Sequence, residues 1–579
     1  MLHRLIQQRL HEAAAAVFPG ASLESVQVRP CPDPRFGDYQ CAAVIGLAKE
    51  RRLNPRQAAA DVAARVDVRE WCEPVEVAGA GFLNFRLRSS ALAEVLGAAL
   101  RGEHFFFARP ARPRTIVIDF SSPNVAKPMH VGHIRSTILG DSLARVLRLL
   151  GHRVITDNHI GDWGTQFGKL LAGWKEHLDP AALAADPIAE MERLYRLVNT
   201  ACDTDPAVLE RARQELVRLQ GGDAENLAIW GKMIELSRRQ FDAVYARLGV
   251  AFDHTLGESF YNPRLKAVVS DLFARNIARE SEGAAVVFFE DQPGLEAHPA
   301  IIRKSDGAAN YTTTDLATLA HRLEEWRPDE IVYVTDGRQQ LHFKQLFAIF
   351  RRWRPEAQVR LAHVWFGAIL GEDGRPFRTR AGDTVRLTDL LDEAEERALR
   401  VVEAKNPDLD PAERRQIARA VGLGAVRYAD LQPNRQSDYI FNWDRMLALD
   451  GNTAPYLQYA HARIKSIFRR LAEQGASGEG WRAGAERGLT LGTGEEAALA
   501  RHLLNFGFVL EAVADEYRPN YLCNYLYELA GKFTAFYEQC PVLKAAEPER
   551  SGRLALCDLT ARLLQQGLAL LGIATPERM

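Results

Sequence analysis

Two histidines separated by two residues stand out among the side chains that could do chemistry. His130 and His133 bracket Val131 and Gly132, and Lys127 lies three residues before the first histidine. Imidazole N–H groups donate hydrogen bonds to phosphate oxygens, more strongly when the ring is protonated, and a lysine adds a positive charge. Glycine lets the backbone approach a ligand closely because it has no Cβ. The group predicts a phosphate site; a metal-binding pair and a polar loop are the alternatives.

The elements around these residues predict a position at the edge of a parallel sheet. An apolar run at 115–120 precedes them, an amphipathic stretch at 134–150 follows, and a second apolar run occupies 153–157. Strand, loop, helix and strand in this order form a βαβ unit with parallel pairing. Ligands bind where such strands end and helices begin, which is where the histidines lie. The loop holds no Cys, Glu or third His to complete a metal shell, so we expect no zinc.

Residues 122–137 closely resemble the extended HIGH signature of class I arginyl-tRNA synthetases. The short His-x-Gly-His pattern is shared with other class I synthetases and related nucleotidylyltransferases, whereas the extended form is much more specific. The resemblance implies a multidomain α/β protein with a doubly wound, Rossmann-type parallel-sheet catalytic domain, an N-terminal α/β domain and a C-terminal all-helical anticodon-binding bundle. It also implies ligation of L-arginine to tRNA(Arg), with ATP and Mg²⁺, through an arginyl-adenylate.

The resemblance assigns roles to residues along the chain. The implied catalytic residues are Lys127, His130, Gly132, His133, Arg378 and Arg380. Those implied to bind arginine are Asp119, Ser121, Asn124, His133, Tyr311, Asp315 and Gln339. Those implied to bind ATP are His130, Gly132, His133, His342 and Phe377. Those implied to contact tRNA are Tyr39, Asn84, Tyr456, Tyr459, Arg463 and Met579. No metal ligand is implied.

Tyr311 and Asp315 can be assessed from their spacing as well. They are i, i+4 at the start of an expected helix that runs to Trp326, so they share one face. A carboxylate there can pair with a guanidinium through two hydrogen bonds. The spacing alone favours an ordinary acidic residue near a helix N-terminus. The resemblance favours a role in holding the arginine side chain, with Asp119 holding the substrate's ammonium group.

The loop at 371–382 stands where class I synthetases carry the KMSKS sequence, and it departs from that pattern. It has no lysine, and its cations are Arg375, Arg378 and Arg380. Several arginyl enzymes lack this lysine and are thought to use the lysine before the HIGH segment, which is Lys127 here. A solvated basic loop is the alternative.

Composition sets outer limits on function. The chain has 579 residues, 47% apolar and 26% charged, with a formal net charge of −2, so contact with tRNA must come from local patches. Its seven cysteines include no Cys-x-x-Cys pair, which argues against a zinc module and a disulfide framework. We find no signal-peptide pattern and no apolar run of about 20 residues. We expect a cytoplasmic monomer without membrane contact or a tightly bound cofactor.

Four regions are expected along the chain. Residues 1–110 resemble the additional N-terminal domain, which touches the tRNA D-loop in the family. Residues 111–383 form the catalytic domain, with a helical insertion around 175–260. Residues 384–450 form a helical stem-contact region, and 451–579 form the anticodon-binding helices. A packing module and an ordinary helical bundle are the alternatives for the two ends. We expect one strand at 359–370 and a glycine-rich loop at 475–494.

Two other functions remain open. A class I synthetase for another amino acid would share the HIGH segment, although Asp119, Asp315 and Tyr311 favour a cationic substrate. A non-catalytic tRNA-binding paralogue would explain the missing KMSKS lysine, but the intact Lys127 and His-x-Gly-His pattern oppose it.

Overall fold

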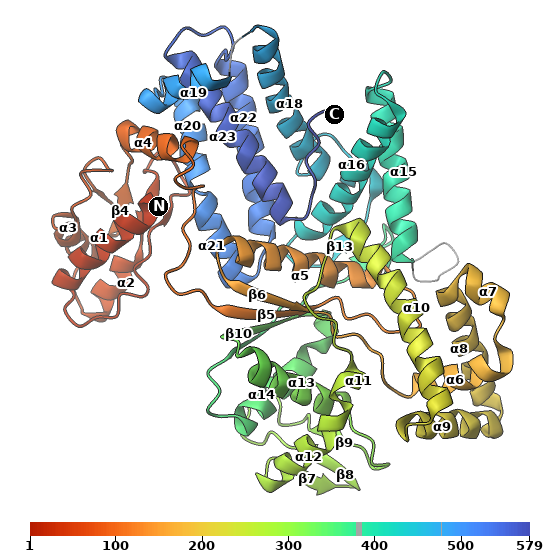
Figure 1. Ribbon diagram of the computed structural model, residues 1–579. Coiled ribbons are helices and arrows are strands. Elements are labelled where there is room, and N and C mark those ends of the chain that lie inside the picture. The colour runs from red at the N-terminus through yellow and green to blue at the C-terminus, as the bar shows by residue number, and fades with distance from the viewer. Residues whose placement is uncertain (378–384, 476–477) are drawn as a thin grey trace. The chain divides into compact units, whose positions relative to one another are not determined.

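The computed structural model describes residues 1–377, 385–475 and 478–579, and the chain divides into two units. The first, called the sheet unit here, comprises Ala111–Ala448 and Leu570–Ile573. The second, the terminal unit, comprises Met1–Pro110, Leu449–Ala569 and Ala574–Met579. Figure 1 shows both units and labels many of their elements.

A four-stranded parallel sheet lies at the centre of the sheet unit. Its strands, in spatial order, are β11 (Arg360–His363), β10 (Glu330–Val334), β5 (Thr115–Phe120) and β6 (Arg153–Asp157). The chain runs from β5 to β6 in one direction and from β10 to β11 in the other, so the order reverses between β5 and β10. Both inner strands are largely apolar and are buried along nearly their whole length, as expected for strands covered on two faces. The expected strands at 115–120 and 153–157, and their parallel pairing, are confirmed.

Helices cover both faces of this sheet (Figure 1). One face carries α5 (Val131–Leu149), and the other carries α13 (Tyr311–Trp326) and α14 (Gln340–Trp353). The core on the second face joins Val117, Ile155 and Ile331 to Leu316 and Leu346. On the first face α5 approaches β5 so closely that a Cβ built on Gly140 would lie 2.1 Å from Cγ of Phe120. The predicted doubly wound fold is confirmed.

A helical insertion follows β6. It consists of α6 (Gln166–His177), α7 (Pro180–Ala185), α8 (Pro187–Thr204), α9 (Pro206–Gln220) and α10 (Ala224–Leu248). The last four begin after aspartates whose carboxylates accept hydrogen bonds from backbone N–H groups of the first turn: Asp179, Asp186, Asp205 and Asp223. Proline occupies the first helical position in three of them, where its missing N–H costs no hydrogen bond.

Shorter elements complete the sheet unit. Between α10 and α13 lie α11 (Glu258–Tyr261), η1 (Asn262–Arg264), α12 (Leu265–Ala274) and an antiparallel sheet of β7 (Arg279–Ser281), β8 (Ala284–Val287) and β9 (Ala300–Arg303). After β10 comes η2 (Gly337–Gln339). Near the end of the unit lie β12 (Ile369–Leu370), α15 (Leu387–Lys405), α16 (Pro411–Leu431), β13 (Tyr439–Ile440) and α17 (Trp443–Met446).

The single strand expected at 359–370 is wrong. β11 ends at His363, and β12 pairs with β13 instead of continuing along β10. The segment between β11 and β12 contains Gly367, whose N–H donates to the carbonyl of Arg435 at 2.9 Å. A Cβ on Gly367 would lie 2.7 Å from the backbone carbon of Ser437. The close approach of these two backbone segments therefore requires glycine at the point where the chain leaves the parallel sheet. Apolar composition alone did not reveal the break.

The terminal unit contains segments from both ends of the chain. Its first part holds α1 (Leu2–Val17), α2 (Ala43–Glu50), α3 (Pro55–Ala63), α4 (Ser89–Leu100) and an antiparallel sheet in the order β1 (Arg29–Pro30), β2 (Tyr39–Cys41), β4 (Phe82–Phe85), β3 (Glu76–Ala78). Asn54 caps α3 by accepting from the N–H groups of Arg56 and Gln57.

The second part of this unit is helical. It holds α18 (Ala454–Glu473), α19 (Gly478–Arg487), α20 (Gly494–Leu504), α21 (Phe506–Glu516), α22 (Asn520–Gln539) and α23 (Glu549–Leu570). The loop expected at 475–494 is therefore wrong in part, because α19 forms there and buries Trp481 and Ala485 on one face. The segment Gly494–Glu516 has the length and composition of a membrane span, but buried core helices meet the same test, and 56% of its most apolar window is buried.

Candidate active site

Loops from two neighbouring strands meet where the strand order reverses. Phe120, the last residue of β5, pairs with Val334, the last residue of β10, so both following loops leave the same edge of the sheet. The first loop and the start of α5 carry the predicted residues from Ser121 to His133. After β10, η2 carries Gln339 and the start of α14 carries His342. Crevices at such reversal points bind ligands in doubly wound folds.

The two histidines form the N-terminal cap of α5. Nδ1 of His130 accepts from the N–H of Gly132 at 3.0 Å, and Nδ1 of His133 accepts from the N–H of His130 at 3.1 Å. Both rings therefore carry their hydrogen on Nε2 when neutral. The cap also explains the glycine, because a Cβ on Gly132 would lie 2.8 Å from Cε1 of His130. Packing of the His130 ring, in addition to ligand approach, requires this glycine.

Burial keeps both imidazoles neutral. It lowers the pKa of His133 to about 3, helped by the adjacent His130. Burial also lowers the pKa of His130, and the positive charges of Arg338 and Lys127 lower it further. Near neutral pH the rings therefore offer neutral Nε2–H groups as donors, without the added strength that protonation would give. Arg338 is a cation close to His130 that sequence reasoning missed.

The backbone between β5 and α5 is strained. Ser121, Ser122 and Ala126 have φ values of 74°, 47° and 60°, in the left-handed region that L-residues rarely adopt. Hydrogen bonds hold this shape: the Ser121 hydroxyl lies 2.8 Å from the hydroxyls of both Tyr245 and Thr137. Ser121 is buried, whereas Asn124 and Lys127 are exposed. The loop thus presents Asn124 and Lys127 outward while Ser121 anchors it.

Asp119 has a buried partner that the sequence did not predict. Arg322 of α13 donates to Asp119 at 2.6 Å and to Asp157 at 2.8 Å, and all three side chains are buried. The hydroxyl of Ser122 donates to the other oxygen of Asp119 at 3.1 Å. Two carboxylates share one guanidinium, so the cluster retains one formal negative charge. Its residual charge suits a cation, although Asp119 is not a free carboxylate.

Tyr311, Asp315 and His342 form one cluster. Nε2 of His342 lies 2.6 Å from the Asp315 carboxylate, and the His342 ring stands edge-on to Tyr311 at 4.8 Å between centroids. Tyr311 is 58% exposed, and Gln339 is also exposed. The structure thus joins residues predicted for arginine binding to one predicted for ATP binding.

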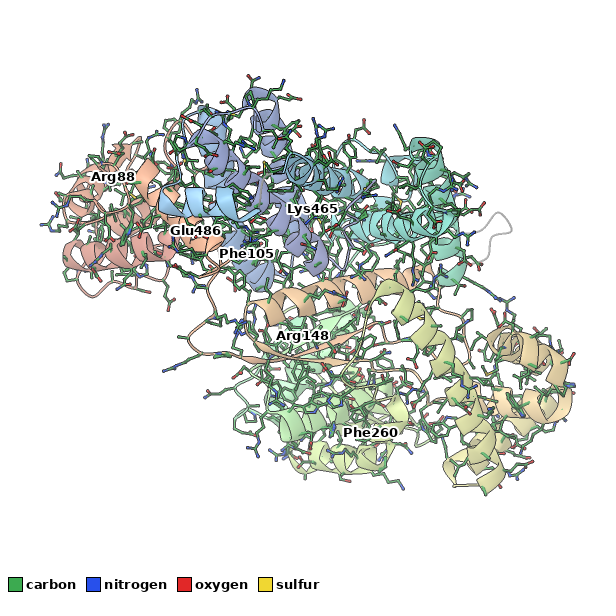
Figure 2. All side chains as sticks on the ribbon, turned by 45° about the horizontal axis from the view of Figure 1, so that its top comes forward. Arg88, Phe105, Arg148, Phe260, Lys465 and Glu486 are labelled. Atoms are coloured by element: carbon green, nitrogen blue, oxygen red, sulfur yellow. The ribbon has the colours of Figure 1, made fainter. Side chains whose placement is uncertain are left out.

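Glu258 is a functional candidate that sequence reasoning missed. Burial raises the pKa of its carboxyl to about 7; the nearby His159 opposes the rise, and Asp315 and Asp162 add to it. Asp162 is itself bonded, accepting from the backbone N–H and hydroxyl of Ser259. A perturbed acid beside Asp315 suits a cationic ligand. Phe260, labelled in Figure 2, lies on the same short helix and is 46% exposed.

The structure describes the first part of the basic loop, 371–377, and the chain again from residue 385. In the first of these segments, the Phe377 ring packs on Phe441 with centroids 4.6 Å apart. In the second, Arg386 pairs with His130 in an antiparallel bridge, and the N–H of Val131 donates to the carbonyl of Val385 at 3.0 Å. Arg378 and Arg380 lie outside the described residues. The chain that leaves the loop is therefore joined directly to the cap of α5.

Two of the predicted tRNA contacts are buried in the antiparallel sheet of the terminal unit. Tyr39 and Asn84 are each 2% exposed, and Asn84 accepts a hydrogen bond from Gln40 at 2.8 Å. Neither side chain is presented on the surface. Their placement therefore does not support a direct tRNA contact.

The other predicted tRNA contacts lie on or beside α18, together with aromatic residues of α22. The Tyr456 ring lies 5.7 Å from that of Tyr527, Tyr459 is 45% exposed, and the Arg463 guanidinium lies 4.7 Å from the Tyr537 ring centroid. Tyr527 and Tyr537 were missed, since nothing near them in the sequence marks them.

The C-terminal tail is bonded to α18. Lys465, labelled in Figure 2, pairs with Glu577 at 3.4 Å, and Arg469 donates to the carbonyl of Glu577 at 3.0 Å. Gln458 donates to the carbonyl of Ala574 at 2.7 Å. These contacts bring the tail that ends at Met579 to the helix that carries the tyrosines.

Comparison with known proteins places this arrangement among described families. Residues 98–443 match the family model for the catalytic domain of class I tRNA synthetases (R), residues 457–579 match the DALR anticodon binding domain, and residues 1–87 match the arginyl tRNA synthetase N terminal domain. Arginine–tRNA ligases of Citrobacter koseri and Chromobacterium violaceum are 46% and 44% identical, each over the full length of both chains.

Solved structures agree with these matches. Arginyl-tRNA synthetase from Plasmodium falciparum is similar with a TM-score of 0.84 and 29% identity, covering 100% of this chain and 99% of that one. The enzyme from Thermus thermophilus is similar with a TM-score of 0.83 and 27% identity, covering 100% of both chains.

Proposed function

The chain belongs to the class I arginyl-tRNA synthetase family, and we propose that the sheet edge between β5 and β10 is where it activates L-arginine. The reaction is the ATP-dependent ligation of arginine to the terminal ribose of tRNA(Arg). First, a carboxylate oxygen of arginine attacks the α-phosphorus of ATP, and the bond to the departing pyrophosphate breaks. The ribose hydroxyl then attacks the carbonyl carbon of the adenylate, and AMP leaves. ATP enters with Mg²⁺ as a co-substrate; we propose no zinc and no tightly bound cofactor.

The observation that carries the proposal is the cap of α5 by two histidines. Their Nδ1 atoms are occupied by backbone N–H groups, which leaves both Nε2–H groups as donors of fixed tautomer. A helix N-terminus adds positive potential to the same place. Donors that are fixed before the reaction stabilise charge developing on the phosphates without reorganising. Neutral rings can do this at any pH above their lowered pKa values.

The substrate arginine is proposed to span two acidic groups. Asp315 and Glu258 bind the guanidinium group. Burial raises the pKa of Glu258 and the charge of Asp315 adds to this rise, which indicates that the two carboxyl groups lie close enough to share one cation. The residual negative charge of the Asp119 cluster receives the ammonium group, with Asn124 beside it. Tyr311 and Gln339 border the side-chain pocket from their exposed positions. His342, bonded to Asp315, adjoins ATP and links the two substrates.

Lys127 is proposed to replace the lysine that the KMSKS position lacks. It is exposed on the loop before the cap, and its charge reaches His130, whose pKa it helps to lower. Arg378 and Arg380 are proposed to add charge from the basic loop, and Phe377 to contact the nucleotide. A second cation, Arg338, approaches His130 from the other loop.

The terminal unit is proposed to bind tRNA(Arg). On α18, the exposed Tyr459 and the half-buried Tyr456 supply stacking surfaces for unpaired bases, and Arg463 supplies positive charge. We also propose a cytoplasmic, monomeric enzyme without membrane contact. All seven cysteines are free, which suits a reducing compartment. Light scattering on the purified chain and fractionation of cells test these two points.

ATP–pyrophosphate exchange with arginine, run with and without tRNA, tests the function. Exchange that depends on arginine supports the proposal, and dependence on tRNA adds gating by tRNA. Exchange with another amino acid in preference to arginine would indicate a different class I specificity. Binding of tRNA without any exchange would indicate a non-catalytic paralogue.

Lys127→Ala tests the proposed lysine replacement. We expect exchange to fall by roughly 100-fold or more with only a modest loss of tRNA affinity, because the charge acts on the phosphates. Arg375→Ala, which removes a cation of the basic loop instead, is the comparison. Unchanged exchange in Lys127→Ala would reject this role for Lys127 while leaving the overall reaction intact.

A further inference from the structure

Lys127 rests against an aromatic ring contributed by the helical insertion. Its ammonium nitrogen lies 5.4 Å from the ring centroid of Tyr195 on α8. In the part of the chain that the structure describes, no carboxylate lies within ion-pairing distance of this ammonium. An aromatic face attracts a cation through its quadrupole but does not neutralise it, as a carboxylate would. The lysine charge is therefore held in place and still free to act on an anion.

The ring belongs to a helix that is packed firmly. Met191, Leu194 and Val198 of α8 are buried. On the neighbouring α6, a Cβ built on Gly173 would lie 3.2 Å from both Leu194 and Val198, so the two helices touch closely. Tyr195 directly follows one of these buried residues and is itself half-buried. It is thus carried by a fixed element rather than by a loop.

A second set of contacts fixes α8 relative to the histidine cap. Arg386 pairs with Asp186 at 3.5 Å and with Glu192 at 3.7 Å, at the beginning of α8. The backbone of Arg386 forms the bridge to His130 described above. Glu192 and Tyr195 are i, i+3 and share one face of the helix. The ring and the cap are therefore joined through a short chain of direct contacts.

From this arrangement we propose that Tyr195 is a positioning residue that holds Lys127 ready for the phosphates of ATP. The inference rests on the proposed role of Lys127 and deepens it. A lysine side chain has four rotatable bonds and many rotamers, so a guiding surface raises the fraction that points correctly. The hydroxyl of Tyr195 plays no part in this role; its ring face does.

A matched pair of substitutions separates the effect of the aromatic face from the effect of side-chain size. Tyr195→Leu keeps an apolar side chain with good helix propensity but removes the π face, whereas Tyr195→Phe keeps that face. We expect Tyr195→Leu to lower kcat of ATP–pyrophosphate exchange by roughly three- to ten-fold with KM for arginine unchanged. Tyr195→Phe should retain the wild-type rate. Leu197→Ala, at an exposed position of the same helix, is the control for general effects on α8.

Coupling to Lys127 decides between positioning and a structural role. In a Lys127→Ala background, Tyr195→Leu should cause no further loss, because the group it positions is absent. Multiplied losses, or equal losses in the Leu and Phe variants, would overturn the inference while the role of Lys127 stands. If Lys127→Ala alone leaves exchange unchanged, both the role of Lys127 and the inference fail. Should Tyr195→Leu lower the melting temperature, Tyr195→Met gives the same comparison in a folded chain.

Discussion

At the scale of single residues, His130 uses its two nitrogens for different tasks. Nδ1 caps α5, which leaves Nε2–H as a donor. His130→Asn places an acceptor near Nδ1 and should preserve stability while exchange falls by roughly 100-fold. His130→Gln places a donor near Nε2 and should retain more exchange while losing about 1 kcal/mol of helix capping. Urea unfolding measures the change in stability, and ATP–pyrophosphate exchange measures the change in activity. If both variants lose stability and activity to the same extent, the two nitrogens do not have separate tasks.

Glu258 predicts a pH dependence for arginine binding. Its pKa of about 7 in the free protein means that the carboxyl is largely neutral at pH 6 and ionised at pH 8. Only the ionised form attracts a guanidinium, so affinity is gained as pH rises through 7 and lost as it falls. We expect KM for arginine to be about ten-fold higher at pH 6 than at pH 8.

Glu258→Gln is the control for this pH effect. The amide cannot ionise, so KM should be raised at pH 8 and should vary little between pH 6 and pH 8. A wild-type KM that does not change with pH would remove Glu258 from the arginine site.

The sequence located some site residues and could not locate others. The two histidines were found because one short segment carries both residues and their flanking strand and helix. Their tautomer was not found, because it depends on cap geometry. Arg322 was missed because its partners, Asp119 and Asp157, lie on other elements far along the chain. Glu258 was missed because its pKa is raised by burial, which no local pattern reports.

At the scale of elements, the contact of α5 with β5 depends on a glycine. A methyl group at Gly140 would collide with Phe120, the last residue of β5 before the loop that carries Ser121 to Lys127. Gly140→Ala should therefore lower the free energy of unfolding by about 1–3 kcal/mol. Gly231 lies exposed within α10 with nothing within 4 Å of its built Cβ. Gly231→Ala should therefore stabilise α10 by up to about 1 kcal/mol.

Hydrogen exchange checks this pair. Amides of β5 and the first turns of α5 should exchange faster in Gly140→Ala, and those of α10 should exchange more slowly in Gly231→Ala. If amide exchange changes in the same direction in both variants, close packing at Gly140 does not determine how alanine affects stability.

Elements buried on both faces were predicted best. β5 and β6 are short, largely apolar strands, and the sequence placed both at their observed bounds. The same signal failed at 359–370, because an apolar run does not report which strand it pairs with. The helix α19 was missed because three of its ten residues are glycines, while Trp481 and Ala485 form its buried face.

At the scale of the whole molecule, both ends of the chain contribute to the terminal unit. Phe105 packs edge-on against Phe506, and Gly507 of α21 lies so close to the backbone of Phe106 that a Cβ would come within 2.3 Å of its carbonyl oxygen. Arg501 pairs with Asp38 at 2.8 Å. A chain that begins at residue 112 would expose Phe506, which is fully buried in the complete unit.

We therefore expect amides of α20 and α21 to exchange faster in that shortened chain. Amides of β5 and β10, which belong to the other unit, serve as the internal reference and should be unaffected. Unchanged protection in α21 would mean that the helical segment is stable without its N-terminal partner.

Because the terminal unit combines segments from both ends of the chain, its parts are synthesised at different times. The residues of its first part leave the ribosome about 340 residues before Leu449. At the usual elongation rate of about 5–20 residues per second, that interval lasts roughly 20–70 s. Throughout it, the apolar surface that later meets Phe506 and Gly507 has no partner, while the sheet unit can fold almost as it emerges. Nascent chains stalled before and after this point should differ in how strongly chaperones bind their N-terminal segment.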